Sequence, residues 1–233
     1  MHAEFDFDGD VVIVTGAGGA LGSAVAEASA GAGGTVAAVD VVEREDASVD
    51  LDAVAYYRAD LTDETDVERL VGEVVDDHGG IDALCNIAGT WRGGDPIDET
   101  DEGTFDLLFD VNLKTVFLAS KHALPHLRES GGSIVSVSAR SSLSGGEGDG
   151  PYRASKAGVR LLTETIAEEN RGTVRANAVM PSVIDTPMNR EMMPDSDFDR
   201  WVAPADIAEV VMFLCSDAAG VTSGAAVPVY GEA

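Results

Sequence analysis

The sequence predicts an α/β protein in which a doubly wound, mostly parallel sheet of seven strands is covered by helices on both faces. Three observations support this prediction. The stretch Val11–Gly22 (VVIVTGAGGALG) joins an apolar strand to a helix through a glycine-rich turn, short apolar strands then alternate with helical segments, and no linker or repeat divides the 233 residues. Strands that alternate with helices form right-handed βαβ units. We therefore expect residues 1–233 to form one domain.

The glycine-rich turn has the context that dinucleotide binding requires. The strand leads directly into a helix that opens at Leu21, and a helix N-terminus offers unpaired N–H groups to a pyrophosphate. Gly16 allows the tight turn, while Gly19 and Ala20 let the backbone approach the phosphates. Gly22 lets the helix pack closely on the sheet. The stretch predicts a Rossmann-type NAD(P)-binding domain, and the alternative interpretation is an ordinary βα turn.

The second strand, Thr35–Asp40, ends in a carboxylate after a helix over Leu21–Ala32. In a dinucleotide-binding fold this position meets the adenosine ribose. Asp40 can accept hydrogen bonds from both ribose hydroxyls but repels a 2′-phosphate, so NAD(H) is the preferred cofactor. Arg44 lies nearby and keeps NADP(H) possible. The alternative is that Asp40 simply ends the strand in a turn.

The rest of the chain continues the alternation. Cofactor contacts gather at the carboxyl ends of parallel strands, where Asp60 and Leu61 are expected. The expected elements are a strand at Ala53–Arg58, a helix capped by Thr62 that ends at Asp77 or His78, a strand at Ile81–Asn86, a helical tract at Phe105–Arg128 with a local break near Asn112 or Pro125, a strand at Ser133–Ser138, a helix from Pro151 to about Asn170, a strand at Val174–Val179, a helix at Pro204–Cys215 and a strand at Val227–Val229.

The charge is strongly negative, with 42 acidic against 15 basic residues and a formal net charge of −27. Such a surface repels nucleic acids and anionic membranes, so we expect neither as a partner. It also repels itself, and salt relieves that repulsion. Because lysine occurs only at Lys114, Lys121 and Lys156, we interpret the composition as halophilic adaptation. Acidity for ordinary solubility is the alternative, and it leaves the scarcity of lysine unexplained.

Cysteine use and the N-terminus indicate a cytoplasmic protein. Cys85 and Cys215 both lie in apolar runs, which predicts buried thiols in a reducing compartment. The acidic start of the chain, Met1–Asp6, lacks an apolar signal core, and no apolar run is long enough to span a bilayer. No metal-ligand spacing occurs, so no metal site is expected.

Tyr152 and Lys156 are spaced i, i+4 and therefore share one helix face. A nearby ammonium favours a phenolate, so Lys156 is expected to lower the pKa of Tyr152 from its ordinary value of about 10. This spacing is common in helices. Here the helix follows the carboxyl end of a strand in a chain that already has a cofactor motif, and this combination indicates general acid or base catalysis.

The ordered set of motifs resembles the short-chain dehydrogenase/reductase family over nearly the whole chain. The resemblance implies that Tyr152 is the general acid or base, that Lys156 lowers its pKa and holds the nicotinamide ribose, and that Asn112 orders a proton-relay water. It also implies that Asn86, Ala88, Gly89, Pro181 and Ile184 line the cofactor cleft. The motifs that carry it are Thr15–Gly22, Asp60-Leu61, Asn86-Ile87-Ala88-Gly89, Asn112, Tyr152-x-x-x-Lys156 and Pro181–Thr186.

Two positions depart from the family pattern. Ala20 stands where the family has glycine, a mild change. Ala139 stands where the family has its catalytic serine, thirteen residues before the tyrosine. Either a neighbouring hydroxyl substitutes, with Ser138 our expected catalytic residue and Ser141 and Ser142 beside it, or the substrate needs no hydroxyl to polarise a carbonyl oxygen.

Other segments are similar to the dihydropteridine reductase branch of that family, which also lacks the serine and reduces a quinonoid ring with NADH. They are Asp40–Glu43, Gly89–Gly94, Ala139-Arg140 and Ile184–Trp201. Trp91 could stack on such a ring or simply pack its loop. With Ala139 and Met188 it is an expected substrate contact, and Thr186–Trp201 is expected to close over the substrate as a lid.

We expect an NAD(H)-preferring oxidoreductase that transfers hydride between nicotinamide and a small carbonyl, alcohol or quinonoid substrate. A dihydropteridine reductase-like enzyme is the first alternative. A catalytically inactive dinucleotide-binding regulator or a structural subunit is the further one, and Ala139 is the only residue in its favour. The family resemblance implies a homodimer or homotetramer built on the helices around Leu113–Leu127 and Ala157–Glu168.

Overall fold

Seven strands form one sheet in the order β3-β2-β1-β4-β5-β6-β7, in a computed structural model that describes residues 5–47, 49 and 54–232. Every pairing between neighbouring strands is parallel, so the sheet is fully and not merely mostly parallel. The strands are β1 Val11–Thr15, β2 Thr35–Asp40, β3 Ala55–Arg58, β4 Ala83–Asn86, β5 Ser133–Val137, β6 Arg175–Pro181 and β7 Ala226–Val229. Of the strand expected at Ala53–Arg58, residue 53 lies outside the described residues.

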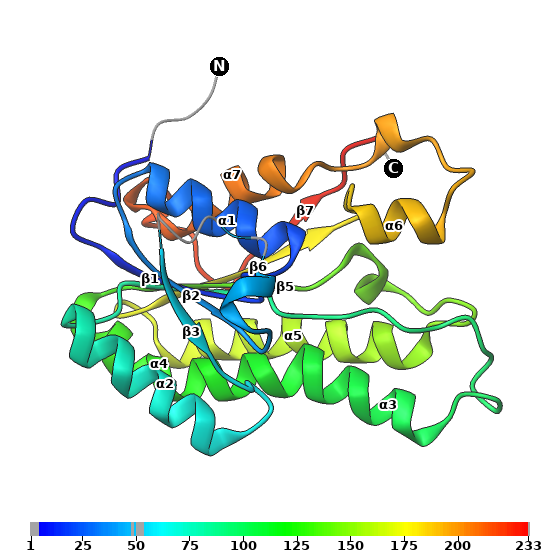
Figure 1. Ribbon diagram of the computed structural model, residues 1–233, viewed down its shortest axis with the longest axis horizontal. Helices are drawn as coiled ribbons and strands as arrows, with labels where there is room; N and C mark the ends of the chain where they lie inside the picture. The colour runs from blue at the N-terminus through cyan, green and yellow to red at the C-terminus, as the bar shows by residue number, and fades with distance from the viewer. Residues whose placement is uncertain (1–4, 48, 50–53, 233) are drawn as a thin grey trace.

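Helices cover both faces of the sheet. In Figure 1, α1 and α7 lie above it while α2, α4 and α5 lie below it, and α3 and α6 extend beyond its right-hand edge. The helices are α1 Ala20–Gly31, α2 Glu64–His78, α3 Glu102–Phe109, α4 Thr115–Ser130, α5 Gly150–Glu169, α6 Pro187–Met192 and α7 Pro204–Cys215. Short 3-10 turns are η1 Arg44–Asp46, η3 Arg140–Leu143, η4 Phe198–Arg200 and η5 Asp217–Ala219.

Two apolar cores lie between the sheet and its helix layers. Successive side chains of a strand point to opposite faces of the sheet. Val12 and Val14 of β1 therefore join the core between the sheet and helices α1 and α7, whereas Val11 and Ile13 join the core between the sheet and helices α2, α4 and α5. Cys85 and Cys215 are buried free thiols with their Sγ atoms 3.7 Å apart, as expected from their apolar surroundings.

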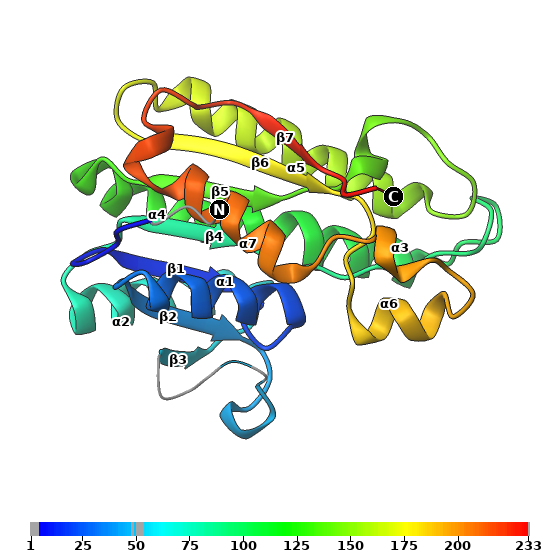
Figure 2. The same ribbon diagram turned by 90° about the horizontal axis from the view of Figure 1, so that it is seen from above.

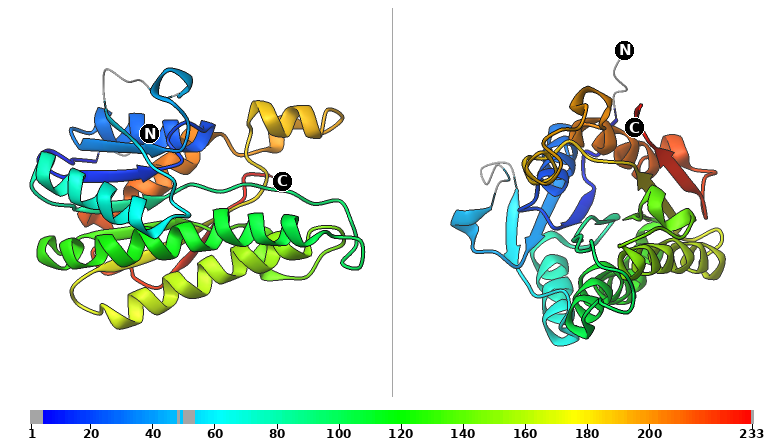
Figure 3. Two further views of the ribbon diagram at one scale, coloured as in Figure 1. Left: turned by 60° about the horizontal axis from the view of Figure 1, so that its bottom comes forward. Right: turned by 90° about the vertical axis from the view of Figure 1, so that its right-hand side faces the viewer.

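The carboxyl ends of the strands point to one edge of the molecule. Figure 2 shows the strand arrows directed toward the side that carries α3 and α6, and the right-hand panel of Figure 3 looks onto that side. Ligands of open α/β sheets bind outside the carboxyl ends of the strands. The fold therefore gathers the loops that follow β1, β2, β4, β5 and β6 around one site.

The helical tract expected at Phe105–Arg128 runs from α3 through a π-helical segment, η2 (Asp110–Lys114), into α4. Asn112 lies inside this segment, so the expected break near it takes the form of a π-helix, a feature common at functional sites. Pro125 lies within α4, which continues to Ser130, so no break occurs there.

The N-cap of α2 differs from the prediction. Asp63, not Thr62, caps this helix, because its side chain accepts hydrogen bonds from the backbone N–H groups of Thr65 and Asp66. The Thr62 hydroxyl instead donates to Asp60 Oδ1 at 2.7 Å. Thr and Asp are both good N-cap residues, and the sequence alone does not show which of two adjacent candidates caps the helix.

Candidate active site

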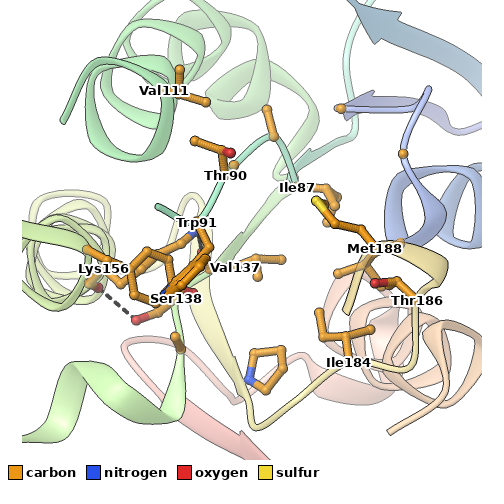
Figure 4. A pocket seen from close by; sticks show the side chains of 18 of the residues that line it. Ile87, Thr90, Trp91, Val111, Val137, Ser138, Lys156, Ile184, Thr186 and Met188 are labelled. Carbon is orange, nitrogen blue, oxygen red and sulfur yellow. Dashed lines mark hydrogen bonds between the residues drawn. The ribbon is translucent and has the colours of Figure 1, made fainter. Parts of the chain in front are cut away.

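One cavity of about 1760 Å³ lies at the carboxyl ends of the strands. It brings together nearly all of the residues that the sequence predicts for cofactor, substrate and catalysis (Figure 4). Asn86 and Asn112 do not line it. The predicted residues that do are Gly16, Gly19, Ala20, Leu21, Asp40, Asp60, Leu61, Ala88, Gly89, Trp91, Ser138, Ala139, Tyr152, Lys156, Pro181, Ile184 and Met188.

The turn after β1 leaves no room for side chains. Gly16 has a φ of +68°, which favours glycine, and a Cβ there would lie 2.8 Å from Cα of Ala88. A Cβ on Gly22 would lie 2.0 Å from the carbonyl oxygen of Gly16. This close packing puts the N-terminus of α1 at the cavity wall, where its free N–H groups suit a pyrophosphate. The glycine cradle thus fits a dinucleotide cofactor.

Thr15, which the sequence analysis did not single out, ties this turn to the next strand of the sheet. Its hydroxyl oxygen accepts hydrogen bonds from the N–H groups of Ile87 at 2.9 Å and Ala88 at 3.1 Å, and it donates to the carbonyl of Cys85. The two loops that follow β1 and β4 are thereby fixed side by side. Its place at the end of a buried strand is the signal that points to such a role.

Asp40 lies at the carboxyl end of β2, as predicted, and its carboxylate is held from two sides. Oδ2 accepts a hydrogen bond from Gly18 N–H at 2.8 Å, and Oδ1 accepts one from Val41 N–H at 2.7 Å. The side chain therefore presents a fixed negative charge to the cavity beside the glycine-rich turn. That is the geometry that suits a ribose diol and disfavours a phosphate at the same place.

Tyr152 and Lys156 both face the cavity from the first turns of α5. The Lys156 ammonium donates a hydrogen bond to the carbonyl of Val137 at 2.9 Å. It also lies close to Gly89, where an added Cβ would be 2.9 Å from Nζ. The lysine thus reaches across from α5 to the ends of β5 and β4.

The pKa values of this pair differ from the expectation. Burial, together with the charge of Asp149, raises the pKa of Tyr152 to about 12, although Arg153 acts in the opposite direction. Burial lowers the pKa of Lys156 to about 8. The expected lowering of the phenol pKa by Lys156 is not found, because loss of hydration dominates at both groups. A phenol with this pKa is protonated at neutral pH and can act as an acid.

The two asparagines lie beneath the cavity rather than in its wall. Asn112 is fully buried, and its amide bridges the Thr90 peptide by accepting from N–H at 2.8 Å and donating to C=O at 3.0 Å. Asn86 donates to the hydroxyls of Ser120 and Ser136. Both amides therefore hold the strand ends and loops around the site, and neither lines the cavity.

The serine cluster beside Ala139 is already hydrogen-bonded. Ser138 lines the cavity but is only 2% exposed, and its hydroxyl donates to the carbonyl of Lys156 at 2.7 Å (dashed in Figure 4). Its oxygen is 3.2 Å from the hydroxyl of Ser142. Ala139 has no polar side-chain group. Ser141 also lines the cavity, and its hydroxyl is hydrogen-bonded to neither Ser138 nor Lys156.

The expected lid, Thr186–Trp201, lines the cavity with residues 186–189, 192 and 193. Figure 4 shows Trp91 and Met188 on opposite sides of the site. A parallel bridge between Ile184 and Val202 joins the two ends of the lid. Inside it, Arg190 forms a two-pronged ion pair with Asp185 and lies 4.9 Å from the ring centre of Phe198.

Sequence reasoning missed several residues that line the cavity around Tyr152, where we expect the substrate; we call this part the substrate end. Arg140 lies 4.8 Å above the ring of Tyr230, and both line the cavity. Asp149 and Arg153 form an ion pair at 2.5 Å beside Tyr152 and line it as well. Tyr230 is close to the C-terminus and carries no motif, whereas Arg153 directly follows Tyr152 and could have been found by asking which charges flank the phenol that the sequence predicts to be catalytic.

Among residues 5–47, 49 and 54–232, no helix has the length and apolar character needed to cross a bilayer. Over the same residues, no cluster of three or more His, Cys, Asp or Glu side chains has the arrangement needed to hold a metal ion.

Comparisons with known proteins point the same way as the geometry. The family model for enoyl-(acyl carrier protein) reductase matches residues 16–231. The chain is 33% identical to a 3-oxoacyl-(acyl-carrier-protein) reductase of Thermotoga maritima, over 96% of this chain and 97% of the relative. It is 34% identical to the meso-2,3-butanediol dehydrogenase of Serratia marcescens, over 97% and 95% of the two chains.

Solved structures agree over almost the whole chain. A ligand-free aldohexose dehydrogenase of Thermoplasma acidophilum superposes with a TM-score of 0.88 at 29% identity, and the alignment covers 98% of this chain and 95% of the other. A short-chain glucose/ribitol dehydrogenase of Brucella melitensis gives a TM-score of 0.90 at 30% identity, with 98% of each chain covered.

Proposed function

The chain belongs to the short-chain dehydrogenase/reductase family of NAD(P)-dependent oxidoreductases that act on alcohols and carbonyls, and we propose that Tyr152 is its general acid and base and NAD(H) its preferred cofactor. The observation that carries this proposal is the convergence of Tyr152, Lys156 and the glycine cradle on one cavity. We further propose that residues 1–233 work as one domain.

In the proposed reaction, the bound nicotinamide supplies or takes up the hydride. Tyr152 donates its phenolic proton to the carbonyl oxygen during reduction and takes it back during oxidation. Burial keeps this phenol protonated at neutral pH, which suits the acid role. The Lys156 ammonium, anchored on the Val137 carbonyl, would hold the nicotinamide ribose and stabilise the phenolate that remains.

The cofactor preference rests on Asp40. Its carboxylate is fixed by Gly18 and Val41, so it cannot swing away from an incoming 2′-phosphate without losing two hydrogen bonds. We expect NADH to bind more tightly than NADPH. Asp40→Asn should narrow the ratio of the two dissociation constants, because a neutral amide removes the repulsion. A ratio unchanged by this variant would contradict the proposal.

A second candidate is reduction of a quinonoid ring, as in dihydropteridine reductases. It is favoured by Ala139 together with the hydrogen bonds that already occupy Ser138. A conjugated ring accepts hydride and proton without a second hydroxyl to polarise a ketone. NADH oxidation with freshly generated quinonoid dihydropterin, compared with a panel of ketones, separates the two substrate classes. If only ketones are reduced, Ser141→Ala becomes the informative variant.

We also propose that the protein forms a homodimer or homotetramer through α4 and α5. Phe117 on α4 and Leu161 on α5 are each about half exposed, at 49% and 53%. Apolar side chains of this size on neighbouring helices favour burial against a second copy of the chain.

Substitution of Tyr152 by phenylalanine tests the proposed function. We expect kcat to fall by a factor of about 100 or more, because the general acid is lost, while the dissociation constant for NADH stays the same. Tyr57→Phe is the matched control, since Tyr57 lies outside the cavity and bonds to Asp77. NADH binding without turnover in the wild type would instead favour the dinucleotide-binding regulator.

A further inference from the structure

The segment Ser141–Ser144, which begins in η3 and leads toward α5, forms a wall of the substrate end of the cavity. Ser141, Leu143 and Ser144 all line the cavity next to Ala139. The wall lies in the connection between β5 and α5, and η3 packs against α5. Between η3 and α5 the chain has no regular structure, so side chains of α5 help to fix its position relative to Tyr152.

Arg153 supplies that support from the residue after Tyr152. Its Nη1 lies 3.1 Å from the carbonyl oxygens of both Ser141 and Ser144, and 3.4 Å from that of Gly145. Its Nε donates to Asp149 Oδ1 at 2.5 Å, which orients the guanidinium. The side chain is 24% exposed; its hydrogen bond to Ser141 is partly buried, and those to Ser144 and Gly145 are exposed.

The guanidinium lies in a space that only glycine leaves open. A Cβ on Gly146 would be 2.2 Å from Arg153 Cζ and 2.3 Å from Nη2. Real atoms do not approach so closely, so a side chain at residue 146 must displace the guanidinium. Gly146 is itself exposed and its φ lies outside the left-handed region, so displacement of Arg153 is the main expected effect of an alanine there.

We propose that Arg153 is a positioning residue that holds the Ser141–Ser144 wall against the substrate and so sets the fit of the carbonyl next to Tyr152. This inference rests on the proposed function for its kinetic consequence. The hydrogen bonds themselves do not depend on it. Arg153 does not contact the reacting atoms, and its effect is on substrate placement, in which small shifts are costly.

Gly146→Ala tests the proposal with Arg153 still present. We expect KM for the carbonyl or quinonoid substrate to rise about tenfold, with a smaller change in kcat and no change in the dissociation constant for NADH. Gly145→Ala is the matched control, because a Cβ there meets nothing within 4 Å and the backbone carbonyl is kept. Equal KM values for the two alanine variants would overturn the proposal.

A double-mutant cycle shows whether the effect passes through the guanidinium. Arg153→Met should raise KM by a similar factor, Arg153→Lys should restore part of the loss, and Gly146→Ala should add nothing in the Arg153→Met background. Additive effects of the two substitutions would mean that Gly146 acts independently of Arg153. Such a result would contradict the inference.

Hydrogen exchange gives a readout that needs no substrate. Amides of residues 141–144 should exchange about fivefold faster in Arg153→Met and Gly146→Ala than in the wild type and Gly145→Ala, since the segment opens more often. Unchanged exchange rates in these variants would show that Arg153 does not fix residues 141–144 in place. If exchange responds as expected while the wild type reduces no substrate, the proposed function fails and the structural role of Arg153 stands.

Discussion

Lys156 is a buried cation whose cost to the fold depends on pH. Burial lowers its pKa from 10.5 to about 8, so between these two values the unfolded chain binds more protons than the folded chain. Stability contributed by this residue therefore rises as pH increases through that window. Below about pH 8 the lysine is charged in both states, and the full cost of burying the charge is present.

Lys156→Met should remove this dependence. We expect the free energy of unfolding of the wild type, relative to that of the variant, to increase by up to about 3 kcal/mol between pH 7 and pH 10, from a pKa shift of about 2.5. Urea unfolding at several pH values measures it. Lys121→Met is the control, because that side chain is 49% exposed and should show no such slope. A difference in the free energy of unfolding between the wild type and Lys156→Met that does not change with pH would contradict the assigned burial cost.

The sequence predicted the positions of the residues beside the glycine-rich turn well and those around Tyr152 poorly, and the roles of both sets remain predictions. Asp40 and Lys156 follow from local rules, because one ends a strand and the other lies one helical turn from Tyr152. Arg140 and Tyr230 are far apart in the sequence, and only the path of the chain brings them together. The Tyr152 pKa was also wrongly predicted, since burial cannot be computed from spacing.

At the scale of elements, the lid is a loop with its own internal support. The bridge between Ile184 and Val202 closes its base, and Arg190 links Asp185 to Phe198, which packs on Trp201 with ring centres 4.8 Å apart. Met188 is 62% exposed, so the inner face of the lid is not yet covered by protein. We expect the lid to move as a unit about its base.

We expect thermolysin to cleave residues 186–201 several-fold more slowly when NADH and a substrate analogue are both present, because the lid then closes over the site. Arg190→Met should accelerate cleavage without ligands, since it removes the link between Asp185 and Phe198. The control is Arg171→Met, which removes an arginine whose side chain is 75% exposed. A cleavage rate that changes neither with the ligands nor in Arg190→Met would contradict this account of the lid.

Most elements could be predicted from the sequence, because apolar strands alternate with helices along the whole chain. β2 and α7 have the predicted bounds, and the other ends coincide, as at Arg58, Asn86 and Val229, or differ by up to three residues. The π-helix at Asp110–Lys114 could be expected only as a break, since its form depends on how Asn112 bridges the Thr90 peptide. That contact joins the π-helix to a loop and leaves no local pattern.

The whole molecule carries a net charge of −27, which the fold must hold in a small volume. At 0.1 M salt these charges repel one another over about 10 Å, the Debye length, which reaches neighbouring charges on the surface. Molar salt shortens it to about 3 Å. We therefore propose that the folded state is adapted to concentrated salt.

We expect the melting temperature to rise by roughly 10 °C between 0.1 M and 2 M potassium chloride, equivalent to a few kcal/mol for a chain of this size. Differential scanning calorimetry with the protein held at one pH and concentration measures it. A melting temperature that stays constant or falls over this range would favour acidity for ordinary solubility over adaptation to salt.

The most direct test of the account follows the hydride. NADH deuterated at both C4 positions is mixed in molar potassium chloride with a panel of ketones or with a quinonoid dihydropterin; NADH oxidation is followed by absorbance, and deuterium on the carbinol carbon of any alcohol formed is measured by mass spectrometry. The account predicts that the wild type oxidises NADH with one substrate class, leaving deuterium on that carbon if the class is the ketones, and that Tyr152→Phe, which still binds NADH, is slower by a factor of about 100 or more. Equal transfer by both proteins, or tight NADH binding with no transfer by either, would contradict it.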